Sequence, residues 1–477
     1  MRIRQLDPRF VLGSDDTKLS RLITGSLVTI DQPSMEPMMD MAESVVADDP
    51  MTWTVTLREG IRFADGSPLT ARDVDHTFRS ILDPATQSVH FRMFDERVAS
   101  VEVIDDRRIR FHLKQQLATF VTDMEIGIVC AACDARGELV GAGPYRLVSQ
   151  EDDEVVLERN PYYFRGPPPM RRIVFRTMTD ANARILVLAG GAADLTQNTV
   201  RLDLVPDVQK LPRVRVVTSP SALLTYLMMK NDDPILADVR VRRAIAYAID
   251  RPAILRAKLA GHAVLATGLL APGHWAYSGD VPRYDYDPAR ARALLDEAGY
   301  PDPDGPGPGV RFTLTYKTSA DAFRVAIARV IAQMLGEVGI GVDVRSFEFS
   351  TFFADVKKGQ YQLASLQTGE IAEPDMYNNF FHSSRIPSPL EPDLANRWRY
   401  RSAEADRLIE DGRRALDRDA RRRIYAQLQR VVATDVPIVP LWNEDNVAVM
   451  NVSVEGFTMV PTARLSSLAR TRKRPKD

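Results

Sequence analysis

Residues 53–74 read WTVTLREGIRFADGSPLTARDV, and this stretch predicts a strand, a turn and a helix in succession. Trp53, Val55 and Leu57 alternate with threonines, which is typical of a half-buried strand. Asp-Gly-Ser-Pro at 65–68 supplies turn residues, and Thr70 to Asp73 forms a capping box that opens a helix. We therefore expect an α/β fold.

The same mixture of elements continues along the chain. Hydrophobic periodicity and turn residues predict two strand-helix-strand crossover units, at residues 173–195 and 312–344. Residues 402–433 predict one long arginine-rich helical stretch whose interspersed acids are typical of a solvated face. No glycine-rich phosphate loop opens a helix after a strand, so the crossover units carry no nucleotide-binding pattern.

Length and charge restrict the class of protein. The 477 residues exceed the roughly 250 to 300 at which a single core stops growing, so two or three lobes are expected. With 62 basic against 64 acidic residues, nucleic acid is not an expected partner. The first residues, MRIRQLDP, lack the apolar stretch of a secretory signal. That leaves two alternatives, an exported protein whose signal is not in this sequence and a cytosolic protein.

The chain contains few residue patterns that support catalysis or metal binding. Its six histidines are scattered, and neither a nucleophile elbow nor a zinc motif is present. Cys130 and Cys133 form a lone C-x-x-C, which is half of a zinc site or one redox pair. The simpler alternatives are two small apolar side chains or one disulfide. We therefore expect no enzyme, no metal and no cofactor.

Residues 361–366 predict a strand, and an acidic loop follows this strand. Carboxylates on a loop broken by glycine and proline, backed by aromatic rings, suit the capture of an ammonium group in a partly apolar cleft. The alternative is a solvated acidic loop in which the last acid caps a helix. The candidate ligand-binding residues are Glu370, Gln367, Gly369, Glu373 and Asp375.

Several dispersed motifs occur in a fixed order along most of the chain. They are residues 53–74, GAGPY at 141–145 with LERNP at 157–161, VRVRRAIAYAID at 239–250, YDP at 286–288 with LLDEAG at 294–299, and DVPIVPL at 435–441. In this order the chain resembles extracellular solute-binding family 5, the binding proteins of peptide, oligopeptide and nickel ABC importers. The resemblance covers most of the sequence.

The resemblance implies a bilobal fold of the periplasmic-binding-protein type II class, with an inserted subdomain. Lobe I is expected at residues 1–28, 162–229 and 442–477, the subdomain at 29–161, and lobe II at 230–441. The implied function is capture of a di- or oligopeptide between the lobes by hinge closure. The implied partners are ABC permease subunits, and the implied state is a monomer in the periplasm or another extracytoplasmic, membrane-associated location.

The resemblance also implies a role for the acidic loop. Peptide-binding relatives hold the ligand's amino group with an Asp where Glu370 stands here, and a common Trp is replaced by Gln367. No arginine clearly matches a partner for the ligand's carboxylate, and Arg324 is expected to face solvent. Three alternatives stay open: a cytosolic sensor of the same fold, a binder of a non-peptide solute such as an oligosaccharide or metal chelate, and a peptide hydrolase.

Overall fold

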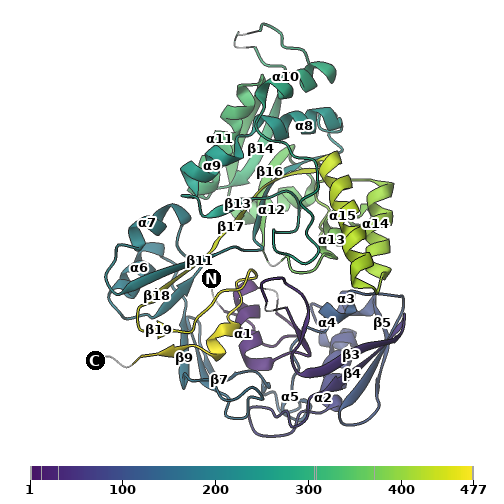
Figure 1. Cartoon of the computed structure of the whole chain (residues 1–477), viewed down its shortest axis with the longest axis vertical. Helices are drawn as coiled ribbons and strands as arrows, with labels where there is room; N and C mark the ends of the chain where they lie inside the picture. The colour runs from purple at the N-terminus through teal and green to yellow at the C-terminus, as the bar shows by residue number, and fades with distance from the viewer. Residues whose placement is uncertain are drawn as a thin grey trace. The chain divides into compact units, whose positions relative to one another are not determined.

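The computed structural model describes residues 3–11, 13–30, 32–305, 307, 309–369 and 371–474. The chain divides into two compact units, and Figure 1 labels many of their helices and strands. Unit 1 comprises Met1–Ser219 and Asn446–Asp477, and unit 2 comprises Pro220–Asp445. The chain therefore passes between the units twice.

Unit 1 consists of several small sheets with short helices. Its sheets have the strand orders β1-β2, β3-β4-β6-β5, β7-β8-β9, β10-β18-β11 and β19-β20. The strands are β1 Val28–Thr29, β2 Met38–Met39, β3 Ala42–Asp49, β4 Thr52–Leu57, β5 Val98–Val103, β6 Arg108–Leu113, β7 Tyr145–Gln150, β8 Glu154–Arg159, β9 Arg172–Arg176, β10 Leu195–Gln197, β11 Val214–Ser219, β18 Asn446–Asn451, β19 Val454–Glu455 and β20 Arg472–Lys473. The helices are α1 Ser14–Thr24, α2 Ala71–Leu82, η1 Pro84–Thr86, α3 Phe91–Asp95, α4 Phe120–Asp123, α5 Ala131–Asp134, α6 Ala181–Ala189, η2 Leu202–Leu204, α7 Val205–Val208 and η4 Ser466–Ala469.

The strand and helix predicted at residues 53–74 are confirmed as β4 and α2. Trp53, Val55 and Leu57 are buried on one face of β4. Thr70 and Asp73 form the capping box of α2. Because α2 buries the apolar face that its periodicity predicts, it packs on the sheet that contains β4.

The crossover predicted at residues 173–195 is wrong. β9 pairs with β8, whereas β10 pairs antiparallel with β18, so the strands on either side of α6 belong to different sheets. Thr196 of β10 lies opposite Val449 in this pairing. The partner of β10 comes from the C-terminal segment, and local periodicity contains no information about so distant a pairing.

Unit 2 is built around one sheet with the strand order β13-β17-β12-β16-β14-β15. Its strands are β12 Leu224–Met229, β13 Ala263–Leu265, β14 Phe312–Ser319, β15 Ile340–Phe347, β16 Leu363–Thr368 and β17 Ile438–Glu444. Its helices are α8 Val239–Ala248, α9 Arg251–Lys258, α10 Pro288–Glu297, α11 Ala322–Gly336, α12 Phe349–Lys358, α13 Met376–Phe381, η3 Ser383–Arg385, α14 Ala403–Arg414 and α15 Arg418–Asp435. The parallel pairing of β14 with β15 around α11 confirms the crossover predicted at residues 312–344.

The core of unit 2 is rich in aromatic side chains. Trp398 is buried, with its ring centroid 5.8 Å from that of Tyr226 and 5.0 Å from that of Phe381. Rings of this size remove a large apolar area from water, and tilted or edge-on contacts add to the stabilisation. This cluster contacts β12 through Tyr226, which also lines a cavity of this unit.

The long helix predicted at residues 402–433 is two helices, α14 and α15, which lie side by side (Figure 1). The break comes at Asp417, whose carboxylate accepts a hydrogen bond from the backbone N–H of Ala420 at 2.7 Å. An Asp at this position starts a new helix because its oxygen satisfies an N–H that has no partner within the helix.

The division into units differs from the lobes expected from the resemblance. Residues 220–229 and 442–445 belong to unit 2, because β12 and β17 pair with each other in the sheet of that unit. The division keeps residues 29–161 within unit 1, so a separate subdomain there stays a prediction. In the ranges that the structure describes, no helix is both long and apolar enough to span a membrane.

Candidate functional site

Unit 2 contains a cavity of about 590 Å³ beside the carboxyl ends of β14 and β16. These two strands are parallel, so their ends meet at one edge of the sheet, the usual position of a ligand site in an α/β sheet. The lining residues are Thr225, Tyr226, Ser319, Asp321, Arg324, Phe349, Phe352, Phe353, Ser365, Leu366, Gln367, Thr368, Gly369 and Arg397. The volume suits a small-molecule ligand.

A hydrogen-bonded network forms the polar side of the cavity. Gln367 donates from Nε2 to Thr225 Oγ1 at 3.2 Å and accepts at Oε1 from Arg324 Nη2 at 2.9 Å. Glu444 Oε1 lies 3.5 Å from Arg324 Nη1 and accepts from Thr225 Oγ1 and Trp442 Nε1. Each polar group is held by another, so the network presents a fixed surface to a ligand.

Aromatic side chains form the apolar side of the cavity. Phe349 and Phe353 on α12 stack with ring centroids 5.8 Å apart, and the Phe349 side chain is 56% exposed. The Arg397 guanidinium lies over the Phe353 ring, 4.9 Å from its centroid. Burial lowers the pKa of Arg397 below its ordinary value.

Tyr226 is a buried residue that lines the cavity. Its hydroxyl lies 3.0 Å from Thr368 Oγ1, and burial raises the pKa of Tyr226. The ring therefore stays neutral and acts as a hydrogen-bonding wall.

The structure separates the candidate residues predicted from the acidic loop. Gln367 and Gly369 line the cavity. Glu370 lies outside the described residues. Glu373 and Asp375 do not line the cavity and are held in buried ion pairs instead.

The two buried pairs join the segment before α13 to the helices beside it. Glu373 Oε1 lies 2.6 Å from Arg421 Nη2 on α15, and Asp375 Oδ1 lies 2.9 Å from Arg413 Nε on α14. Loss of water raises the pKa of Glu373, and Arg421 opposes that shift. Asp375 stands at the N-cap of α13, but its side chain makes no capping hydrogen bond. The solvated, helix-capping alternative for this loop is therefore wrong.

Sequence reasoning misplaced one arginine and missed another. Arg324 does not face solvent as expected, since its side chain is 26% exposed and contacts Gln367. Arg397 was not a candidate, although it lies among alternating arginines and aromatic residues at 397–400, a pattern that mixes buried rings with cations. Only the folded chain brings it beside α12.

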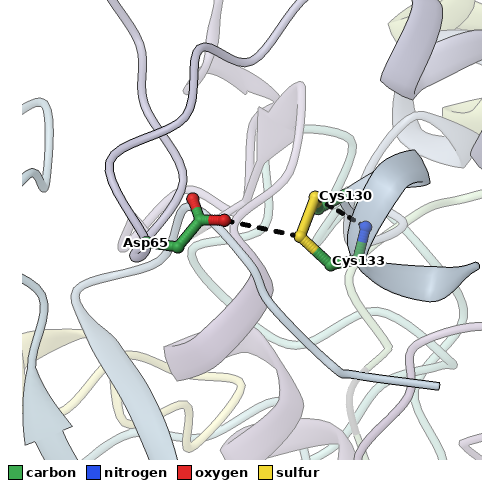
Figure 2. Close-up of side chains that lie close together, drawn as sticks. All are labelled: Asp65, Cys130 and Cys133. Carbon is green, nitrogen blue, oxygen red and sulfur yellow. Dashed lines mark hydrogen bonds between the residues drawn. A yellow bond between two sulfur atoms is a disulfide. The ribbon is translucent and has the colours of Figure 1, made fainter. Parts of the chain in front are cut away.

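The two cysteines form a disulfide, one of the alternatives left open by the C-x-x-C. Figure 2 shows Asp65 beside it, with Oδ2 3.6 Å from Cys133 Sγ. These three residues form a cluster of potential metal ligands. A cysteine binds a metal as a thiolate, so the disulfide form does not supply those ligands.

Comparisons with known proteins identify the family of this chain. The model of the family described as bacterial extracellular solute-binding proteins, family 5 middle, matches residues 36–388. The oligopeptide-binding protein AppA of Bacillus subtilis (strain 168) is 27% identical over 96% of this chain and 87% of its own length. The glutathione-binding protein GsiB of Escherichia coli (strain K12) is 29% identical over 89% of this chain and 84% of its own length.

Solved structures of similar fold cover nearly the whole chain. The ABC transporter substrate-binding protein CtaP of Listeria monocytogenes has a TM-score of 0.86 and 25% identity, over 98% of this chain and 96% of its own. NikZ of Campylobacter jejuni, solved with Ni(L-His), has a TM-score of 0.83 and 20% identity, over 99% and 97%.

Proposed function

The chain belongs to family 5 of the bacterial extracellular solute-binding proteins, and we propose that it captures a peptide-like solute in the cavity of unit 2 for an ABC importer. The observation that carries this proposal is the mixed chemistry of the cavity. The cavity is lined both by a hydrogen-bonding network of Gln367, Arg324 and Thr225 and by phenylalanines of α12. A peptide offers both backbone polar groups and apolar side chains, so it matches both sides.

The names of the relatives support the same class of solute. AppA is an oligopeptide-binding protein and GsiB a glutathione-binding protein, and both bind ligands with peptide bonds. The cavity of about 590 Å³ is within the range of small-ligand sites and suits a short peptide better than a single ion.

We propose that Glu370 binds the amino group of this solute. Glu370 directly follows Gly369, which lines the cavity, and a carboxylate makes a charge-assisted hydrogen bond to an ammonium group. Gln367 then offers an amide where relatives often carry a Trp, so recognition there is through hydrogen bonds rather than ring stacking. Glu373 and Asp375 are left out of the proposed site because both are held by arginines.

We propose that capture occurs by hinge closure, and the way the chain connects the units supports this. It passes between them at Ser219–Pro220 and Asp445–Asn446, and a few residues between strands are enough to absorb a domain rotation. A solute that contacts the closed form better than the open one shifts the protein toward closure. We infer that the closed form is presented to a permease, that the protein works outside the cytoplasm at the membrane as a monomer, and that it leaves the solute chemically unchanged.

The test is a binding and turnover assay on one peptide library. The full chain is incubated with synthetic di- to pentapeptides, separated from unbound peptide on a desalting column, and both fractions are analysed by mass spectrometry. We expect a subset of peptides to be retained with unchanged masses. New cleavage products would instead support the hydrolase alternative. Retention of an oligosaccharide or a nickel–histidine chelate, tested in parallel, with no peptide retained would contradict the peptide proposal.

A further inference from the structure

Among the described residues, two arginines line the cavity of unit 2, and they differ in how their charge is compensated. Arg324 Nη2 donates to Gln367, and Arg324 Nη1 lies 3.5 Å from the Glu444 carboxylate. The positive charge of Arg324 is therefore already balanced within the network, and its main role is to hold Gln367 in place.

Arg397 lacks such a partner among the residues that the structure describes. No described carboxylate lies within 4.0 Å of its guanidinium, and its buried Nε–H has no hydrogen-bond acceptor there. Asp393 is close enough to raise the pKa of Arg397. Its carboxylate pairs with Lys357 at 2.9 Å, however, and its side chain is 83% exposed. A desolvated cation without a counter-charge is unfavourable, and a bound anion relieves that cost.

The surroundings of Arg397 place its guanidinium against an aromatic ring. The group lies over the Phe353 ring, which is stacked on Phe349 at an interplanar angle of 9°. A guanidinium fixed on a ring keeps its outer N–H groups free for a planar, two-oxygen partner. Asp321 also lines the cavity, but its Oδ1 accepts from the backbone N–H of Arg324 and caps α11.

We propose that Arg397 binds a carboxylate of the solute, so that the cavity selects solutes with an anionic group. This inference rests on the proposed function, because it requires the solute to occupy this cavity. The carboxylate comes from the C-terminus of a peptide or from an acidic side chain, and both present the same two oxygens. A solute that is neutral at this end leaves the guanidinium unpaired.

The first test needs no peptide. In uniformly ¹⁵N-labelled full chain, the Nε–H signal of Arg397 is assigned by its loss in Arg397→Gln, or in Arg397→Lys if the first variant does not fold. The protein is titrated with succinate, and with succinamide at equal ionic strength as the neutral match. We expect a saturable shift of the Arg397 signal with succinate and none with succinamide. Equal behaviour of the two compounds, or no shift, overturns the proposal.

The second test identifies the source of the carboxylate. Calorimetry compares Ala-Ala-Ala with its C-terminal amide, and Ala-Glu-Ala amide with Ala-Gln-Ala amide. We expect about tenfold tighter binding of the charged member in one pair, and loss of that preference in Arg397→Gln. The control is Arg345→Gln, an exposed arginine on β15 paired with Asp343, which should keep it.

The outcomes of the two tests separate the two proposals. A preference that persists in Arg397→Gln overturns the role of Arg397 while leaving peptide binding intact. If no peptide binds the parent protein, the proposed function fails, and the succinate titration still decides the role of Arg397.

Discussion

Gln367 sets the polarity of the cavity at the scale of single residues. Its amide bridges Thr225 and Arg324, so both ends of the side chain are already hydrogen-bonded before a ligand arrives. Satisfied polar groups in a buried network resist rearrangement. We therefore propose that the cavity selects solutes that fit this arrangement rather than adapting to many.

Replacing Glu370 with alanine tests the amino-group contact. We expect a loss of about 1.5 to 3 kcal/mol in the binding free energy of the tightest library peptide, the range for a charged hydrogen bond. Calorimetry measures it, with Glu404→Ala, an exposed acid on α14, as the matched control. A change below about 1 kcal/mol in Glu370→Ala contradicts the amino-group role.

His274 makes stability depend on pH. Burial lowers its pKa from 6.5 to about 4, and its Nδ1 accepts from the backbone N–H of Ala276, so protonation there loses a hydrogen bond. The neutral ring contributes stability above pH 6.5, and this contribution is lost as the pH falls toward 4. Between pH 7 and pH 4 the parent should lose about 2 to 4 kcal/mol more unfolding free energy than His274→Gln.

Urea unfolding at the two pH values checks this expectation for His274. The control is His112→Gln, a substitution of a ring that is 39% exposed. If the parent and His274→Gln lose the same unfolding free energy between pH 7 and pH 4, the interpretation of His274 is wrong.

Of the candidate residues predicted on the acidic loop, Gln367 and Gly369 line the cavity, whereas Glu373 and Asp375 do not. Gln367 and Gly369 could be placed because they follow a strand end, where ligands bind in α/β sheets. The pairing of Glu373 with Arg421 depends on a helix packed against the loop from elsewhere in the chain. The position of Arg397 depends on α12 in the same way. Such contacts have no local signature.

At the scale of helices and strands, two ion pairs fix the segment before α13 to α14 and α15. Arg421 is buried, pairs with Glu373, and lies 5.1 Å from the Trp275 ring centroid. Removing one partner of a buried pair leaves the other charge uncompensated.

Arg421→Met should therefore lower the unfolding free energy by about 3 to 5 kcal/mol. Arg423→Met, on the same helix at an exposed position, should change it by less than about 0.5 kcal/mol. Urea unfolding at pH 7 measures both. Equal effects of the two substitutions are incompatible with a stabilising role for the Glu373 pair.

The cap of α2 offers a second test at this scale. Thr70→Ala removes one capping acceptor and should cost about 1 kcal/mol of unfolding free energy. Asp73→Ala should cost more, because its carboxylate accepts from the N–H groups of both Thr70 and Ala131. Thermal and urea unfolding measure the difference, with the exposed Arg72→Ala as control. A smaller loss for Asp73 than for Thr70 contradicts this account.

Local elements were predictable where their stabilising contacts are local. Neighbouring residues indicate the alternation at β4, the capping box of α2, and the crossover formed by β14, α11 and β15. The crossover predicted around α6 failed because β10 pairs with the C-terminal β18. The break at Asp417 was visible as a cap residue, but the periodicity on either side of it was interpreted as continuous.

At the scale of the whole molecule, the resemblance to a two-lobed family predicted more than periodicity did. Neighbouring residues indicate an α/β class, whereas the order of motifs implied the solute-binding family that the comparisons then showed. Residues 220–229 and 442–445, which the resemblance assigned to lobe I, lie in unit 2 because β12 and β17 pair within its sheet.

We propose that this protein binds a peptide-like solute without changing it. The decisive measurement is native mass spectrometry of the full chain, purified from its host without denaturation. We predict a bound species whose added mass, released by activation and fragmented, gives the sequence of a short peptide. An added mass that fragments as a sugar or a metal chelate would contradict the claim.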